Sequence, residues 1–391
     1  MQISEAVKYV GVNDHKIDLF EGQFDVPLGM AYNSYLIMDD KIAVMDSVDA
    51  SFGNEWMENI NAQLNGRTPD YLVVQHMEMD HSANIQKFAD AFPDAKIVAS
   101  KMAFAMMKSY FGNDFANRQV VVAEGFVLEL GTHSLHFIAA PNVHWPEVVM
   151  TYESSEKILF SADAFGKFGA NDVEDPEGWA CEARRYYFGI VGKFGANVQA
   201  LLKKASSLDI STICSLHGPV LNSDIATYLN YYNIWSGYGV ESDGVMIAYT
   251  SVYGNTKKAV EKLAEIVKAK GCPKVVVADL AREDVFENVE NAFRYGKLIL
   301  ASTTYNGGVF PAMREFIEHL TERNYQNRMI GFVENGSWAP TAAKAMKALF
   351  EKGLTEGCKN LTFADQKVSI KIAMTEKNVA EMETLAEQML C

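Results

Sequence analysis

Cysteine is scarce in this chain of 391 residues, which contains five, all far apart in the sequence. No two of them form a C-x-x-C pair, so nothing in the sequence indicates a thiolate metal site, a disulfide framework or a fused iron–sulfur module. We therefore expect the protein to work in a reducing compartment, the cytoplasm. The cysteines are Cys181, Cys214, Cys272, Cys358 and Cys391.

Long apolar runs and excess positive charge are also missing. No run approaches the roughly 18 residues that a membrane span needs, and the N-terminal M-Q-I-S-E-A-V-K lacks the regions of a signal peptide. The formal net charge is −15, from 50 acidic and 35 basic residues, which argues against a nucleic-acid partner. With 49% apolar and 22% charged residues, the chain is expected to form two to three globular domains.

The most informative stretch is Y-L-V-V-Q-H-M-E-M-D-H-S-A-N, from Tyr71 to Asn84. It opens with an apolar run of the length of a buried strand, and four side chains that commonly bind metals follow it. In an extended segment the first three of them point to the same side, and a helix is expected to begin only after the fourth. A metal site is the functional interpretation, and a solvated polar turn is the structural alternative. The four residues are His76, Glu78, Asp80 and His81.

Strands and helices around this stretch indicate two kinds of domain. Up to residue 241, short alternating runs with helices before and after them indicate an αββα sandwich. From Ser242 onward, apolar strands alternate with amphipathic helices, with a last strand expected at Ser369 to Met374. This order is typical of a doubly wound parallel sheet. We place the link in the small polar stretch Gly237 to Gly244, which predicts domains 1–241 and 242–391.

Three further candidate metal ligands each follow a short apolar strand and precede a turn. They are His144 in P-N-V-H-W-P-E, Asp163 in L-F-S-A-D-A-F and His217 in C-S-L-H-G-P. A single residue of this kind is more often a cap or a hydrogen-bonded polar group. Together with the first stretch, however, four strand ends would converge on one edge of the sandwich. Four imidazoles and three carboxylates suit two metals that share a carboxylate, with zinc, manganese or iron as the metal.

The pattern H-x-E-x-D-H, then H-W-P, D-A-F and H-G, resembles the metallo-β-lactamase-like domain of flavodiiron proteins. Hydrolases of that superfamily have histidine where this chain has Glu78, whose harder oxygen ligand fits iron. The resemblance implies an iron pair bridged by Asp163, in which a water can replace His81. One iron would be held by His76, Glu78 and His144, and the other by Asp80, His81 and His217.

The resemblance extends to G-M-A-Y-N-S-Y-L-I (29–37) and E-A-R-R-Y-Y (182–187). It implies that Tyr186 or Tyr187 lines the substrate pocket. Many members of the family have a histidine beside the diiron pocket in an F-H-G segment, whereas this chain has Glu21 in F-E-G. Glu21 is a hydrogen-bond acceptor or a proton donor, which leaves the balance between oxygen and nitric oxide reduction open.

Three loops in the second domain indicate a cofactor site. T-S-V-Y-G-N-T (250–256) leads from a strand into a helix, where hydroxyls and free N–H groups suit a phosphate. S-T-T-Y-N-G-G (302–308) and E-N-G-S-W-A-P (334–340) follow two more strands. Neither G-x-G-x-x-G nor a Walker A motif is present, which argues against a dinucleotide or ATP.

The three loops together resemble those of flavodoxin, with FMN lying across them. The third loop departs from the usual Gly-Trp-Gly pattern because it reads Ser337-Trp338-Ala339. The residues expected to contact FMN are Thr250, Ser251, Tyr253, Gly254, Asn255, Thr256, Thr303, Thr304, Tyr305, Asn306, Gly307, Asn335, Gly336 and Trp338.

The resemblance covers essentially the whole chain and implies an oxidoreductase. FMN would take electrons from a rubredoxin-type or other small redox protein and pass them to the diiron site, which reduces dioxygen to water or nitric oxide to nitrous oxide. It also implies a head-to-tail homodimer, with a tetramer as the alternative, in which Trp338 lies near the junction of the two cofactors. Two other functions stay open: a flavodoxin-fused zinc metallohydrolase, and a non-enzymatic electron carrier or gas sensor. Glu78 argues against the first, and the complete seven-residue set argues against the second.

Overall fold

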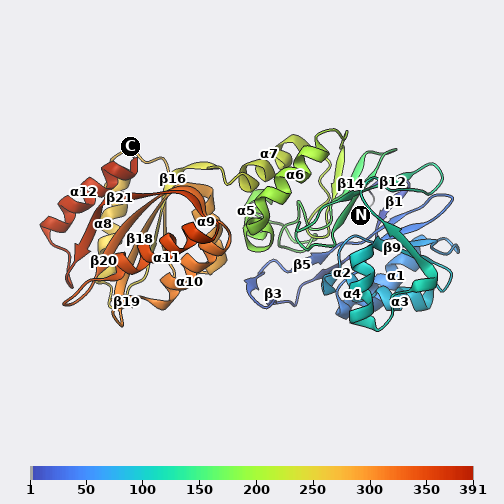
Figure 1. The fold of residues 1–391 in the computed structure, drawn as a ribbon, viewed down its shortest axis with the longest axis horizontal. Coiled ribbons are helices and arrows are strands. Elements are labelled where there is room, and N and C mark those ends of the chain that lie inside the picture. Colours follow the sequence, from blue (N-terminus) through green and yellow to red (C-terminus); the bar gives the residue numbers. More distant parts are fainter. Residues whose placement is uncertain (1–2, 391) are drawn as a thin grey trace. The chain divides into compact units, whose positions relative to one another are not determined.

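The computed structural model describes residues 3–390 of the chain. It divides into two compact units, Met1–Asn233 and Ile234–Cys391 (Figure 1). The division lies within helix α7 (Ile225–Ser236), just before the predicted link, and the domain limits 1–241 and 242–391 stay a prediction. No helix in residues 3–390 combines the length and the apolar composition that crossing a membrane requires.

Two β-sheets form the centre of the N-terminal unit. In the first, β7 to β10 are parallel, and β1 and β6 extend the sheet in antiparallel fashion. Its strands, in spatial order, are β1 (Val7–Tyr9), β6 (Tyr35–Ile37), β7 (Ala43–Met45), β8 (Tyr71–Val74), β9 (Lys96–Ser100) and β10 (Gln119–Val122). The strands of the second, in spatial order, are β11 (Val127–Glu129), β12 (Ser134–Ala139), β13 (Val149–Glu153), β14 (Ile158–Phe160) and β15 (Thr212–Cys214).

Alternate residues of both sheets point inward and form one apolar core between them. Met45 and Val73 of the first sheet belong to the same buried cluster as Phe137 and Phe160 of the second. Burial of one such side chain stabilises the fold by about 1.5–3 kcal/mol. Because the side-chain period of a strand is two, this burial also decides which face of each strand is turned inward.

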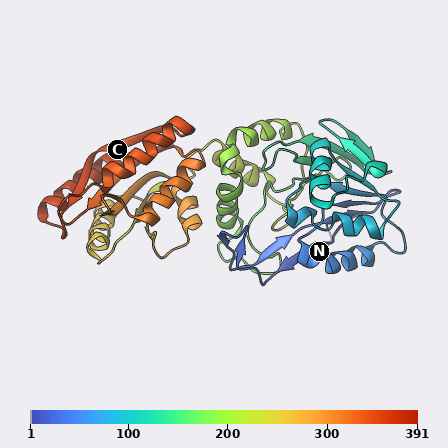
Figure 2. The ribbon, with the colours of Figure 1, turned by 60° about the horizontal axis from the view of Figure 1, so that its bottom comes forward.

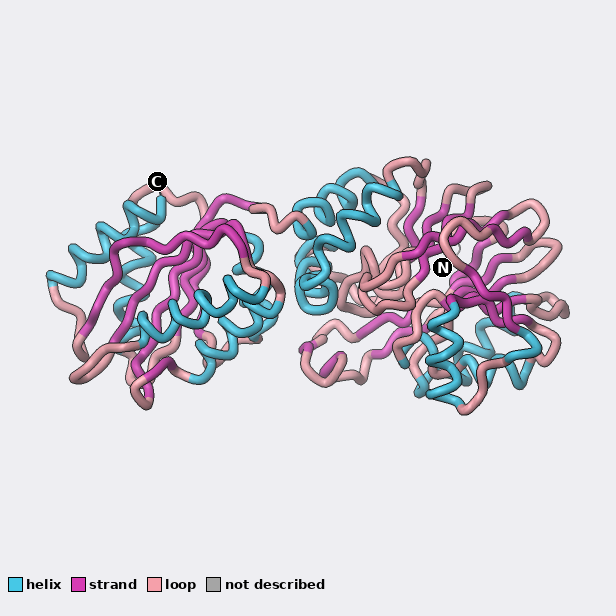
Figure 3. The backbone as a smooth tube through the Cα atoms, viewed as in Figure 1, coloured by secondary structure: helices cyan, strands magenta, loops and turns pink. Residues whose placement is uncertain are grey.

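Helices cover the outer faces of the two sheets, which confirms the predicted αββα sandwich (Figure 3). Helix α4 shows how the sequence marks its ends: the Ser100 side chain accepts a hydrogen bond from Ala103 N, and Gly112 ends the helix at φ +67°. The helices are α1 (Gly53–Gln63), α2 (Met79–Ser82), α3 (Ile85–Ala91), α4 (Lys101–Phe111), α5 (Trp179–Tyr186), α6 (Gly195–Ala205) and α7, with short turns η1 (Ala50–Phe52), η2 (Ala116–Arg118), η3 (Tyr187–Val191) and η4 (Gly192–Phe194). Two small ribbons complete the unit, β2 (Val12–Asp14) with β5 (Met30–Tyr32) and β3 (Leu19–Phe20) with β4 (Phe24–Asp25).

The C-terminal unit is a five-stranded parallel sheet with helices on both faces, as predicted (Figure 2). The spatial order of the strands reverses at β16, and this is where doubly wound folds bind ligands, beyond the carboxyl ends of the strands. In spatial order the strands are β17 (Val275–Asp279), β16 (Ser242–Tyr249), β18 (Tyr295–Tyr305), β20 (Gln326–Asn335) and β21 (Lys359–Ile370), with β19 (Gly308–Val309) paired to β18. The helices are α8 (Asn255–Ala269), α9 (Val285–Arg294), α10 (Pro311–Glu322), α11 (Ala342–Glu356) and α12 (Glu376–Leu390).

The predicted last strand, Ser369 to Met374, is wrong in position. β21 begins at Lys359 and ends at Ile370. It pairs only with β20 and lies at the edge of the sheet, where polar residues such as Lys359 and Asp365 are favoured. The apolar signal of a buried strand is therefore confined to its last residues.

Candidate metal centre and cofactor cleft

The first four candidate ligands follow β8 in two different backbone conformations. The prediction of an extended segment through Asp80 is wrong in its last part, because helix α2 already begins at Met79. Glu78 occupies the N-cap with extended dihedrals, φ −61° and ψ 146°. His76 and Glu78 are therefore presented from extended backbone, whereas Asp80 and His81 come from a helical turn.

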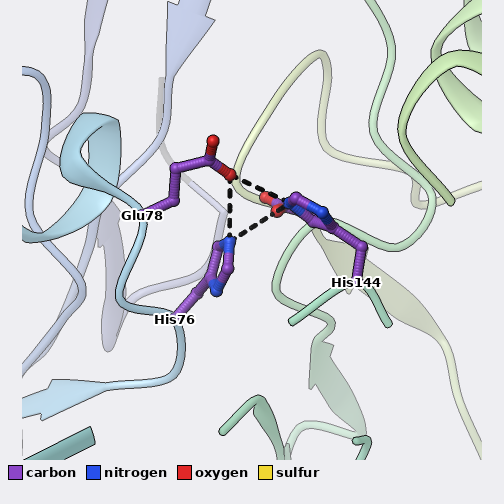
Figure 4. A group of neighbouring side chains, drawn as sticks. His76, Glu78 and His144 are labelled. Atoms are coloured by element: carbon purple, nitrogen blue, oxygen red, sulfur yellow. Dashed lines mark hydrogen bonds and ion pairs between the residues drawn. The ribbon is translucent and has the colours of Figure 1, made fainter. Parts of the chain in front are cut away.

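His76, Glu78 and His144 point toward one another and form the first half of a cluster (Figure 4). Oε2 of Glu78 lies 2.9 Å from Nε2 of His144 and 3.3 Å from Nε2 of His76. Oδ2 of Asp163 lies 3.1 Å from each of the same two nitrogens. Two imidazoles and two carboxylates thus meet around one point.

Asp80, His81 and His217 form the second half of the cluster. Oδ2 of Asp80 lies 3.1 Å from Nε2 of His81 and 3.3 Å from Nε2 of His217. Oδ1 of Asp163 lies 3.4 and 3.7 Å from the same two nitrogens. The two oxygens of Asp163 therefore face different halves of the cluster, and the structure brings all seven predicted residues together.

The electrostatics of the cluster favour positive charge. Burial lowers the pKa of His81 and of His144, but neighbouring carboxylates more than compensate and raise these values to about 10 and about 9. Burial raises the pKa of the Asp163 carboxyl, but His76, followed by His144 and His81, lowers it well below its usual range. Buried carboxylates that stay ionised among imidazoles are the charge pattern of a cation site.

Several polar atoms of the cluster have no hydrogen bond to the protein, which is unusual for buried polar groups. Within residues 3–390, Oδ1 of Asp80 is buried without a hydrogen bond, and Oδ2 of Asp80 and Oδ1 of Asp163 form none although they face imidazole nitrogens. Nε2 of His81 lies 2.9 Å from Nε2 of His217, so two ring nitrogens face each other. Since buried polar groups are normally paired, the donor set and these atoms fit two metal ions.

Tyr186 lies beside the cluster, whereas the ring of Tyr187 packs elsewhere. The ring centroid of Tyr186 is 5.5 Å from that of His217. The ring of Tyr187 packs against Tyr232 instead, at 5.1 Å. Of the two tyrosines that the sequence left open, Tyr186 is the one that the structure places at the cluster.

Glu21 lies in the turn between β3 and β4, with a positive φ of 50°. Although Glu21 is exposed as a residue, desolvation of its carboxyl, followed by the negative charge of Glu78, raises the pKa of that carboxyl to about 7. His144 acts in the opposite direction and lowers it. The side chain is therefore close enough to the first half of the cluster to interact with two of its members.

Sequence reasoning missed Glu147, which lies three positions after His144. Its Oε1 accepts a hydrogen bond from Nδ1 of His76 at 2.9 Å. Glu147 ends the segment P-N-V-H-W-P-E that contains His144, but a glutamate after a proline has no pattern that marks it as part of a metal site. Its role depends on a contact 71 residues away in sequence.

The three loops of the C-terminal unit surround a cleft of about 510 Å³ at the switch point of the sheet. Twelve of the fourteen residues predicted to contact FMN line it; Thr250 and Gly254 do not. Thr250 is buried and its hydroxyl pairs with Ser302 Oγ at 3.2 Å, while Gly254 supplies the positive φ of 85° before α8. The lining residues that were not predicted are Val252, Ser337, Ala339, Thr341 and Ile372.

The cleft offers a phosphate site without charged side chains and two exposed aromatic rings. Ser251 Oγ accepts hydrogen bonds from Gly254 N and Lys257 N, which fixes the loop at the start of α8. The first-turn N–H groups of a helix lack intrahelical acceptors and suit a phosphate. Tyr305 is 46% and Trp338 85% exposed, so both rings are free to cover a planar group. The volume, the helix terminus and the rings fit FMN.

Comparisons with known proteins match both units. The profile of the ODP family beta lactamase matches residues 30–218 and that of the flavodoxin domain residues 246–365. The anaerobic nitric oxide reductase flavorubredoxin of Aliivibrio fischeri is 27% identical to this chain over 348 residues. The aligned part is 86% of this chain and 70% of that protein. The crystal structure of the flavodiiron protein from Giardia intestinalis has a TM-score of 0.90 at 25% identity, over 100% of this chain and 96% of that one.

Rubredoxin oxygen:oxidoreductase from Desulfovibrio gigas shares the fold, with a TM-score of 0.91 at 23% identity over 100% of this chain and 97% of that one. The two profiles match the two units in the order in which the sequence predicted them. They agree with the names of the relative and of the structural neighbours, which confirms the resemblance that the motifs indicated. The chain belongs to the flavodiiron proteins.

Proposed function

We propose that this protein is an oxidoreductase that reduces dioxygen to water, nitric oxide to nitrous oxide, or both. Electrons would reach a diiron centre through FMN from a small redox protein of the rubredoxin type. One observation carries the proposal: seven ligand-type side chains from four strand ends converge, and the two oxygens of Asp163 face the two halves of the set. The membership of the chain in the flavodiiron family supports it.

The residues of the cluster divide between two irons. His76, Glu78 and His144 would hold one, Asp80, His81 and His217 the other, and Asp163 would bridge them. The lining residues of the cleft would hold FMN. When bound, the irons and the flavin supply the electron transfer, and the protein supplies position and electrostatics.

Aromatic side chains form an apolar wall beside the second half of the cluster. The ring of Phe20 meets His217 edge-on at 5.3 Å, and that of Phe168 meets Tyr186 at 5.2 Å. Such a wall admits small neutral gases and excludes water. Burial, followed by the charge of Asp163, raises the pKa of Tyr186 well above its usual value, so its hydroxyl keeps its proton as a hydrogen-bond donor.

The two reactions make different demands on the site. Dioxygen needs four electrons and four protons to yield two waters, whereas two nitric oxide molecules need two of each to yield nitrous oxide and one water. Anaerobic stopped-flow of the fully reduced protein against each gas separately decides between them. If neither gas reoxidised the protein, the electron carrier or sensor would be favoured.

The assembly and the location stay predictions. We propose a head-to-tail homodimer, with a tetramer as the alternative, and a cytoplasmic location. The exposed ring of Trp338 at the cleft is the side chain that we expect the dimer to cover. Measurement of molar mass in solution by light scattering tests the first of these predictions.

The purified protein is expected to be yellow and to contain about two irons and one FMN per chain, because the cluster offers two ligand sets and the cleft one flavin site. Elemental analysis and flavin quantification after expression with added iron measure both. Stoichiometric zinc without iron would contradict the diiron proposal and support the metallohydrolase.

Replacing Glu21 by histidine is expected to raise the rate with dioxygen relative to the rate with nitric oxide. The carboxyl lies beside Glu78, and removing a negative charge there favours the substrate that gains more charge during reduction. The measurement is the ratio of the two rates in mutant and wild type at one pH. Asp18→His, an exposed position on the same segment, controls for the charge change alone. An unchanged ratio in Glu21→His, or a shift toward nitric oxide, would refute the role of Glu21.

A further inference from the structure

His76 differs from the other imidazoles of the cluster in the partner of its second ring nitrogen. Its Nε2 lies 3.1 Å from Asp163 Oδ2 and faces the metal position. Its Nδ1 lies 2.9 Å from Oε1 of Glu147, and both side chains have no solvent exposure. The imidazole is therefore held between the metal position and a buried carboxylate.

Within residues 3–390, no carboxylate accepts a hydrogen bond from the second ring nitrogen of the remaining three imidazoles. Nδ1 of His217 donates to a neutral acceptor, the carbonyl oxygen of Ala31, at 2.8 Å. No hydrogen bond joins Nδ1 of His81 or of His144 to the part of the chain that the structure describes. Each half of the cluster has one carboxylate of its own and shares Asp163. The buried Asp46 acts on His81 and on His76, so the outer carboxylate that is hydrogen-bonded to one half only is Glu147.

Backbone contacts hold Glu147 in place. Its Oε1 also accepts a hydrogen bond from Met77 N at 2.9 Å. Val149 N donates to Gln75 O at 3.1 Å, which ties the start of β13 to the segment before His76. Oε2 of Glu147 is buried without a hydrogen bond among residues 3–390. A carboxylate in this setting is costly unless positive charge lies nearby.

We propose that Glu147 is a positioning residue that makes the two metal positions unequal. By accepting a hydrogen bond from His76 Nδ1–H, it fixes the ring and makes Nε2 a stronger electron donor. The position formed by His76, Glu78 and His144 then binds metal more tightly than the other and stabilises the ferric state more. Iron there has the lower reduction potential of the pair. This inference rests on the proposed diiron function.

Metal binding to the metal-free protein tests the inference without reference to turnover. Co²⁺ is titrated into wild type and Glu147→Gln, which keeps the size of the side chain and removes its charge. Outer partners of metal ligands change affinity by about 10–100-fold, so we expect one of two Co²⁺ sites to weaken by that factor and the other to stay unchanged.

Three further variants separate charge, position and folding. Glu153→Gln removes another buried carboxylate, at the end of β13, which accepts hydrogen bonds from Ser155 N and Glu156 N and lies outside the cluster; it is expected to bind Co²⁺ as wild type does. Glu147→Asp keeps the charge and is expected to lose less affinity than Glu147→Gln. In a His144→Ala protein, where the first position is already lost, adding Glu147→Gln is expected to leave the remaining Co²⁺ site unchanged.

A reductive titration of the iron-loaded protein, followed by electron paramagnetic resonance, gives a second readout. Dithionite supplies the electrons. We expect the two one-electron steps of the iron pair to move closer together in Glu147→Gln. A tenfold change in the ratio of ferric to ferrous affinity corresponds to 59 mV for a one-electron couple.

The outcomes distinguish this inference from the function on which it rests. If wild type does not bind two Co²⁺ per chain, the proposed diiron function itself is wrong. If wild type binds two and Glu147→Gln weakens both equally, or neither, Glu147 does not make the positions unequal. Equal losses in Glu147→Gln and Glu147→Asp would show that the charge is not what matters. Melting temperatures identify a variant that fails to fold, and Glu147→Asp then carries the test against Glu153→Gln.

Discussion

Replacing Asp163 by alanine is expected to abolish gas reduction and to empty both metal positions. Oδ2 of this residue faces His76 and His144, and Oδ1 faces His81 and His217, so its loss removes a ligand from each half at once. Loss of an outer partner of a metal ligand costs about 10–100-fold, and loss of a shared ligand is expected to cost more. Metal content and turnover per chain measure the effect.

Two matched variants test whether the effect of Asp163→Ala comes from the loss of the two charged oxygens at this position. Asp163→Asn keeps the shape of the side chain but has one carbonyl oxygen in place of two charged oxygens, so we expect it to lose at least one metal. Asp209→Ala removes an aspartate whose side chain is 77% exposed and which pairs with Lys157, and it is expected to behave as wild type. Two irons retained in Asp163→Ala would show that this carboxylate does not bridge them.

Replacing His144 by alanine is expected to abolish turnover while FMN stays bound and reducible. The imidazole belongs to the first half of the cluster in the N-terminal unit, whereas every residue that lines the cofactor cleft belongs to the C-terminal unit. We expect about one iron to be lost per chain and the flavin spectrum to be unchanged. The measurements are iron content, flavin absorbance and gas consumption.

His136→Ala is the control for this change. His136 lies on β12, upstream of His144, and its Nε2 is 3.3 Å from Ser154 Oγ, outside the cluster. It is expected to keep full activity and both irons. If His144→Ala turned over at a rate near that of the control, His144 would not be a ligand.

The fold was predictable where burial imposes a clear period on the sequence. Tyr71 to Val74 is a four-residue apolar run, and β8 has these bounds because the strand is buried on both faces. The long edge strand β21 was placed too late, since its first seven residues include lysine, asparagine and aspartate, all three exposed. Local pattern therefore identifies central strands and misses those at the edge of a sheet.

The candidate site was predictable to the extent that its residues are chemically distinctive. Histidines and carboxylates after strands are rare enough to be noticed, and the structure brings all seven together. Glu147 and the division of roles between Tyr186 and Tyr187 were not predictable, because both depend on side-chain direction within the folded unit. Likewise, Ile372 reaches the cofactor cleft from beyond the end of β21, in a segment without any glycine-rich motif.

The origin of the seven ligands also bears on how the N-terminal unit is assembled. Four of them follow β8 of the first sheet, and the others follow β12, β14 and β15 of the second. Metal ions bound by these residues would connect the two sheets of the sandwich. A ligand that binds only the folded state stabilises it by RT ln(1 + [L]/Kd), about 2.7 kcal/mol at a 100-fold excess over Kd. The supply of iron in the cell would then govern how much folded protein accumulates as well as how fast each molecule works.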